Sequence, residues 1–162
     1  MGFLSMFRKS KNVSVIPLNG IIAPNIGRRK GLNLNELDKS IEQAFSVKNL
    51  KAVVLQINSP GGSPVQSEMI AKRIRELSEK NNVPVLAFVE DVAASGGYWL
   101  ACAADEIFAS KASIIGSIGV VSSGFGFDKA IEKIGVDRRL YTSGNNKAIL
   151  DPFLPENKDD VK

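Results

Sequence analysis

The chain of 162 residues contains no histidine. A Ser-His-Asp triad, a Cys-His dyad and a histidine-ligated zinc site are therefore excluded within it. If a serine of this chain is a nucleophile, another group must accept its proton, and lysine is the known substitute in serine hydrolases. No metal site and no cofactor are expected.

Cysteine and long apolar runs are also scarce. Cys102 is the only cysteine, so no internal disulfide can form, and its apolar neighbours predict a small buried side chain. No run approaches the roughly 18 apolar residues that span a bilayer. Residues 1–7 are too short for a signal-peptide core, and their basic neighbours follow instead of preceding them. We therefore expect a cytoplasmic or peripheral membrane location.

Positive charge is concentrated near the N-terminus. The first 51 residues hold nine Lys and Arg against three Asp and Glu, whereas the rest hold twelve against fourteen. No aromatic residues interleave the basic clusters at 8–11 and 28–30, so nucleic acid is not an expected partner. Apolar residues 1–7 beside a basic cluster favour contact with an anionic membrane surface; a solvated N-terminal segment is the alternative.

Apolar runs alternate with amphipathic segments and predict an α/β fold, with a mainly parallel sheet flanked by helices. Asn33 is placed to cap one helix, and Pro64 lies early in another, whose expected apolar stripe is Val65, Ile70, Ile74 and Leu77. The expected strands are 13–18, 52–57, 83–89, 106–109 and 137–141, with a turn feeding a strand within 113–121; the expected helices are 34–45, 64–81, 96–104 and 125–134.

The length suits one main domain. Residues 1–12 are expected to form a short apolar and basic segment, and residues 13–155 the domain itself. Residues 156–162 read as the start of a C-terminal helix that the chain truncates.

Two glycine-rich turns each follow an apolar strand and precede a helix: Pro60-Gly61-Gly62, and Gly96-Gly97 after Ser95. In a parallel sheet such turns emerge at the same edge, where sites are usually built. A serine at the start of a helix, with the N–H of Gly96 beside it and that of Gly62 nearby, has the layout of a nucleophile next to oxyanion donors. Two ordinary strand-to-helix turns are the alternative.

The base is harder to choose from the residues alone. A lysine has an ordinary pKa of about 10.4, so it acts as a base near neutral pH only where burial lowers that pKa. Most lysines of this chain lie on predicted helix surfaces or in loops. Lys147 is followed by an apolar Ala-Ile-Leu that could exclude water, which is weak local evidence.

Four motifs together resemble signal peptide peptidase A and its relatives, the serine–lysine peptidases of the Clp protease/crotonase superfamily. They are NSPGG at 58–62, VAASGGYW at 92–99, AAD at 103–105 and GSIGV at 116–120. The resemblance extends over about residues 13–155. It implies a Clp protease/crotonase-like layered fold of repeated ββα units.

The resemblance also implies roles for single residues. Ser95 would be the nucleophile and Lys147, in the SGNNK loop at 143–147, the general base. Gly62 and Gly96 would supply the oxyanion N–H groups, and Ser117 would orient the lysine amine. The substrate would be a cleaved signal peptide or another hydrophobic peptide. In relatives the paired serine and lysine come from different subunits or repeats, so a homo-oligomeric ring is expected.

Two other functions stay open. A crotonase-like enzyme acting on an acyl-CoA thioester would use the same backbone donors, with Glu90 and Asp91 as a candidate carboxylate pair. A truncated, inactive homologue would keep only a peptide-binding or assembly surface.

Overall fold

The computed structural model describes residues 10–25, 31–144 and 147–160. The chain divides into two units, Met1–Gly119 and Val120–Lys162, and each is described here by itself. Residues 1–9, which carry most of the predicted membrane contact, lie outside the described residues. None of the described helices is both long enough and apolar enough to cross a bilayer.

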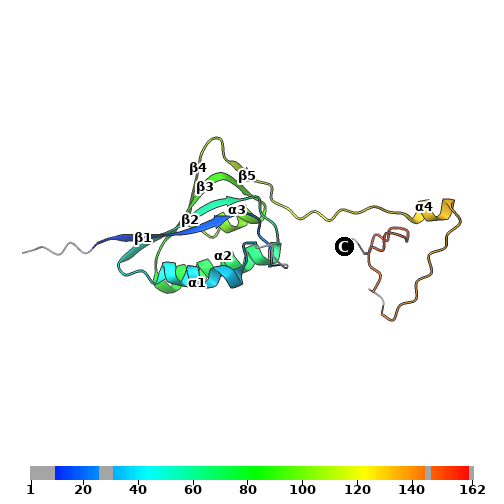
Figure 1. The fold of residues 1–162 in the computed structure, drawn as a ribbon, viewed down its shortest axis with the longest axis horizontal. Helices are drawn as coiled ribbons and strands as arrows, with labels where there is room; N and C mark the ends of the chain where they lie inside the picture. Colours follow the sequence, from blue (N-terminus) through cyan, green and yellow to red (C-terminus); the bar gives the residue numbers. More distant parts are fainter. Residues whose placement is uncertain (1–9, 26–30, 145–146, 161–162) are drawn as a thin grey trace, which may run out of the picture. The chain divides into compact units, whose positions relative to one another are not determined.

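The first unit is built on a five-stranded sheet in which every pairing is parallel. The order β1-β2-β3-β4 places the edge strands on either side of β2 and β3, and β5 pairs with the last part of β3 (Figure 1). The strands are β1 (Asn12–Asn19), β2 (Leu50–Ser59), β3 (Val85–Ala94), β4 (Glu106–Ala109) and β5 (Ile114–Gly116).

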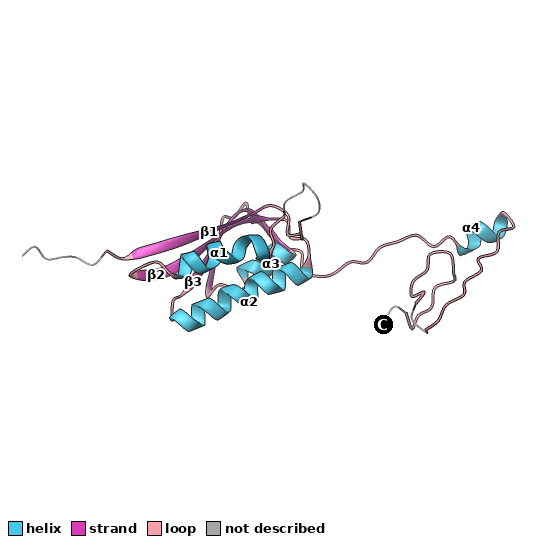
Figure 2. Cartoon of the chain, turned by 60° about the horizontal axis from the view of Figure 1, so that its bottom comes forward, coloured by secondary structure: helices cyan, strands magenta, loops and turns pink. Residues whose placement is uncertain are grey.

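Three helices cover one face of this sheet: α1 (Leu34–Phe45), α2 (Pro64–Asn81) and α3 (Gly96–Ala101) (Figure 2). Alternate residues of β1, β2 and β3 are apolar and buried beneath them; these residues are Ile16, Leu18, Val53, Leu55, Ile57, Val85, Ala87 and Val89. The predicted fold class, a mainly parallel sheet with flanking helices, is confirmed.

The two long helices have the bounds that the sequence predicts. The Asn33 side chain accepts a hydrogen bond from the Glu36 N–H at 3.1 Å, which caps α1. Ser63 caps α2, and Asn82 ends it in the left-handed conformation. Arg73 of α2 pairs with two acidic side chains of α1 and so ties the helices together.

Two predicted buried side chains are exposed. Val65 is 62% exposed because it lies five residues before Ile70, about 140° around the helix from the buried face. Helix α3 ends at Ala101, three residues earlier than predicted, and Cys102 is its C-cap residue. At this position the cysteine side chain is exposed to solvent. The predicted buried thiol is therefore wrong.

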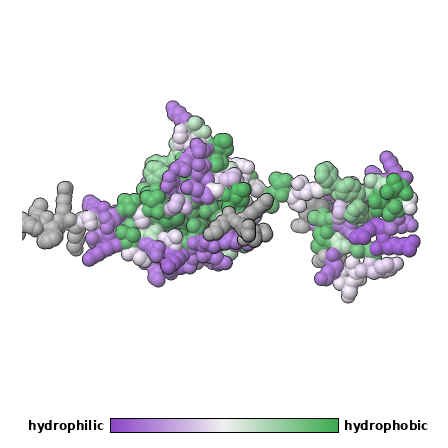
Figure 3. Space-filling model, in the orientation of Figure 1, coloured by the Kyte–Doolittle hydropathy of each residue, from purple (hydrophilic) through white to green (hydrophobic). Residues whose placement is uncertain are grey.

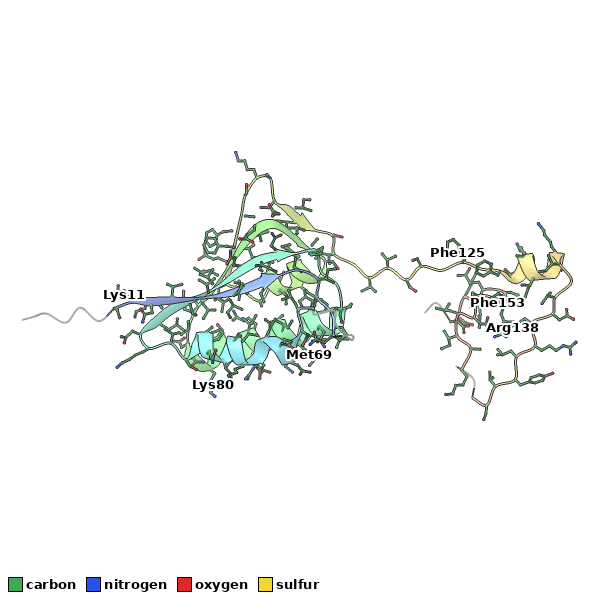
Figure 4. The ribbon with its side chains drawn as sticks, in the orientation of Figure 1. Lys11, Met69, Lys80, Phe125, Arg138 and Phe153 are labelled. Atoms are coloured by element: carbon green, nitrogen blue, oxygen red, sulfur yellow. The ribbon has the colours of Figure 1, made fainter. Side chains whose placement is uncertain are left out.

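The second unit holds one short helix, α4 (Asp128–Lys133), where a longer one was expected over 125–134. The predicted strand at 137–141 does not form, because no other strand is present in the described part of this unit for it to pair with. Instead, Arg138 pairs with Asp151 at 2.9 Å and lies over the Phe153 ring (Figure 4). Residues 158–160, the last described positions, form a turn.

Candidate active site

Ser95 is the single residue between the end of β3 and the start of α3. Its backbone angles, φ 52° and ψ −120°, belong to a region that side chains other than glycine rarely adopt. Such a conformation costs about 1–3 kcal/mol and persists only where the surroundings impose it. Here the Ser95 N–H donates to the Gly116 carbonyl at 2.8 Å, and the Ser95 carbonyl accepts from the Trp99 N–H at 3.0 Å. The backbone is thus fixed.

The Ser95 side chain remains available for chemistry. Its hydroxyl is half-buried and makes no hydrogen bond to any described residue. A sharp strand-to-helix turn that presents a serine in this way is the arrangement used for nucleophiles on α/β sheets.

The second glycine-rich turn packs directly against the first. A Cβ atom placed on Gly61 would lie 2.6 Å from the Gly96 nitrogen and 2.9 Å from the Ser95 Cβ. A Cβ placed on Gly96 would collide with the Ser67 hydroxyl and would lie 3.4 Å from the Gly62 nitrogen. Both positions therefore require glycine, and the expected meeting of the two turns at one sheet edge is observed.

This contact brings two unused backbone donors beside Ser95. Within the described ranges, the N–H groups of Gly62 and Gly96 have no acceptor, whereas those of Gly61 and Ser63 are both bonded. Two N–H groups near a hydroxyl can hold the negative oxygen of a tetrahedral intermediate. The structure places the three residues together; their roles stay predictions.

Ser117 and Lys147 are placed differently. Ser117 follows Gly116, whose carbonyl bonds the Ser95 N–H, and it is exposed with a positive φ of 53°. The turn and the strand expected within 113–121 occur in the opposite order: β5 forms at Ile114–Gly116, and residues 117–121 form no strand, since Ser117 and Gly119 have positive φ. Lys147 belongs to the second unit and is exposed there, so its pairing with Ser95 stays a prediction.

The carboxylate pair considered for acyl-CoA chemistry is already engaged. Glu90 accepts a hydrogen bond from Gln56 at 2.6 Å, and Asp91 accepts one from Asn58 at 2.9 Å. Both lie where β3 bulges against β2, between the pairs Ile57–Val89 and Ser59–Ala93. Before the bulge β3 pairs with β4, and after it β3 pairs with β5 and ends next to Ser95. The pair thus has a structural explanation.

Two buried serines beside the turns were not among the predicted site residues. Ser59 ends β2, and Ser67 lies on α2 against Gly96. A signal for Ser59 exists in the sequence, because it continues the alternation of Val53, Leu55 and Ile57 and so must point inward. A signal for Ser67 exists too, because it lies three residues before Ile70 and seven before Ile74, on the buried face of α2.

The parallel sheet, its one-sided helix layer and the serine turn define a Clp protease-like α/β fold. A mutant of a membrane-bound stomatin-specific protease shares this fold: it superposes with a TM-score of 0.52 at 23% identity, over 71% of this chain and 54% of that protein. Residues 78–162 match the family description "Peptidase family S49". The chain belongs to peptidase family S49.

One of two curated relatives carries a peptidase name. A putative signal peptide peptidase SppA of Enterococcus faecium is 33% identical over 147 residues, which cover 88% of this chain and 42% of that protein. A protein of Brucella melitensis named Na(+)/H(+) antiporter NhaA is 50% identical over 151 residues, covering 93% of this chain and 20% of that protein. The chain thus spans less than half of the length of either relative. Most of the protein that carries the antiporter name is not matched by this chain.

Proposed function

We propose that the chain is a serine endopeptidase whose nucleophile is Ser95 and whose general base is Lys147. The observation that carries the proposal is the strained turn of Ser95, with the unused N–H groups of Gly62 and Gly96 beside it. Residues 13–155 would form the peptidase domain.

The proposed reaction has two stages. The Ser95 Oγ attacks the scissile carbonyl while its proton passes to the Lys147 amine. The carbonyl oxygen becomes an oxyanion, which the Gly62 and Gly96 N–H groups stabilise. The C–N bond breaks as Lys147 gives the proton to the leaving amine, and an acyl-enzyme remains. Water then attacks the ester, its proton passes to Lys147 and on to Ser95, and the acid is released.

Lys147 needs a water-excluding environment to act as a base. In its own unit it is exposed, and no described residue of that unit is buried. A segment of this size without a core gains stability only by covering its apolar side chains against another surface. We therefore propose a homo-oligomer in which association buries Lys147, with Ser117 holding the amine.

The proposed substrate is a hydrophobic peptide, such as a cleaved signal peptide. The support is the exposure of apolar side chains on both sides of Gly116, whose carbonyl bonds the Ser95 N–H: Ile114, Ile115 and Ile118 are 66%, 41% and 70% exposed. Exposed apolar side chains cover part of the surface of each unit (Figure 3). A putative signal peptide peptidase among the relatives agrees with this substrate class. Work in the cytoplasm or at a membrane surface is part of the proposal.

Hydrolysis of a fluorogenic apolar peptide tests the proposal. Ser95→Ala and Lys147→Ala should each lower kcat/KM by at least about 10³-fold, because each removes a group that acts in the transition state. Lys111→Ala is the matched control, since Lys111 is also an exposed loop lysine and should leave turnover unchanged. Full turnover in Ser95→Ala would exclude Ser95 as the nucleophile.

A further inference from the structure

We propose that Ser59 is a positioning residue that sets the direction of the Gly62 N–H. This inference rests on the proposed function, in which that N–H holds the oxyanion. It concerns a residue that makes no contact with the peptide and would act only through the turn that follows it.

Ser59 is fully buried at the end of β2, and both capacities of its hydroxyl are used. The Oγ donates to the Gly20 carbonyl at 2.7 Å and accepts from the Gly61 N–H at 3.1 Å. One hydroxyl therefore joins the chain that leaves β1 to the glycine turn that leaves β2. No alanine or valine could make either bond.

The next peptide plane is fixed from its other side. The Gly61 carbonyl accepts from the Ile22 N–H at 2.9 Å, and the Ser63 N–H donates to the Ile22 carbonyl at 2.7 Å. In a trans peptide the C=O and N–H point in opposite directions. Because Ile22 holds the Gly61 carbonyl, the Gly62 N–H must point away from the Ile22 backbone. Ser59 fixes the residue that begins this plane.

Ser59 also touches the second turn. A Cβ placed on Gly97 would collide with the Ser59 carbonyl oxygen and would lie 3.2 Å from the Ser59 Cβ. The same residue thus bonds one glycine turn and packs against the other. A change at Ser59 would therefore alter the distance between the Gly62 and Gly96 N–H groups. Stabilisation of a transition state by such donors depends on their positions to within a few tenths of an ångström.

The test compares Ser59→Ala with Ser78→Ala in the full chain. Ser78 is also a buried serine, and it donates to the Val83 carbonyl at 2.8 Å, near the start of β3, the end of that strand opposite Ser95. Each variant loses a buried hydroxyl, so both should lower the unfolding temperature. Only Ser59→Ala should lower kcat, about 10- to 100-fold with KM changed less than about twofold, because a misaimed donor weakens the transition state more than the bound substrate. Ser59→Thr, which keeps the hydroxyl, should recover part of the lost kcat.

A second readout does not depend on turnover. In amide NMR spectra, Ser59→Ala should shift the Gly61 and Gly62 resonances and speed Gly61 hydrogen exchange at least about tenfold, whereas Ser78→Ala should leave both unchanged. Equal kcat in the two alanine variants, or unchanged Gly61 and Gly62 amides in Ser59→Ala, would overturn the inference. If the unmodified chain shows no turnover, the proposed function fails, and the amide spectra alone decide the role of Ser59.

Discussion

Ser95 adopts a backbone conformation that glycine would occupy at no cost. We predict that Ser95→Gly is more stable than Ser95→Ala by about 1 kcal/mol, since glycine relieves the strain while both variants lose the hydroxyl. Urea unfolding of the two variants measures the difference. An alanine variant as stable as the glycine variant would show that the turn stores no strain.

The Ser14 hydroxyl is a buried polar group on β1 for which the described residues provide no hydrogen-bond partner. We predict that Ser14→Ala raises the free energy of unfolding by up to about 1 kcal/mol, because the unpaired hydroxyl no longer has to leave water. A loss of stability in the same urea titration would mean that this hydroxyl has a partner.

At the scale of elements, Asp105 joins α2, β3 and the start of β4. The Val85 N–H donates to its carboxylate at 2.8 Å, and Arg75 pairs with it at 2.9 Å. The Val85 hydrogen bond, followed by that of Arg75, lowers the pKa of Asp105 below its ordinary value of 3.8. A carboxyl with a lowered folded pKa stabilises the fold above its unfolded pKa, and this contribution is lost as the pH falls through the folded value.

We therefore predict that acidification below about pH 4 destabilises the unmodified chain more than it destabilises Asp105→Asn. The difference should stay under about 1 kcal/mol, because the pair is partly exposed and screened by water. Thermal unfolding at several pH values measures it. If the unfolding temperatures of the two proteins fall equally with decreasing pH, Asp105 makes no acid-sensitive contribution to stability.

The sequence predicted those elements whose signals are local. The bounds of α1 and α2 follow from Asn33, Pro64 and the apolar period, and the strands of the parallel core follow from short apolar runs. The expected strand at 137–141 had the right composition, but a strand needs a neighbour, which composition cannot supply. The role of the Ser59 hydroxyl was missed because it donates to the Gly20 carbonyl, which lies beyond the end of β1 and 39 residues away in the sequence.

In the candidate site, the part that is built from neighbouring residues could be predicted. Ser95 and the two glycine turns were predicted together, and the structure places them in contact. The strained backbone of Ser95 is held by the Gly116 carbonyl, which is distant in the sequence. No local sequence pattern could therefore predict this strain. Lys147 rests mainly on the resemblance, since its only local signal is the apolar Ala-Ile-Leu that follows it, and none of the described residues of its unit is buried.

At the scale of the whole molecule, the proposal requires copies of the chain to meet. If Ser95 of one copy works with Lys147 of another, mixing the inactive Ser95→Ala and Lys147→Ala chains should restore activity. Random association in equal amounts leaves about a quarter of the sites with both residues intact, so about a quarter of the original kcat is expected. A mixture as inactive as its components would show that each site takes both residues from one chain.

The claim on which all else depends is that Ser95 is an activated nucleophile. Exposure of the full chain to a fluorophosphonate, followed by intact mass measurement and peptide mapping, tests it most directly. The account predicts one adduct, at Ser95, that is absent from Ser95→Ala and forms more slowly in Lys147→Ala. An adduct that forms equally in Ser95→Ala, or no adduct in the unmodified chain, would contradict it.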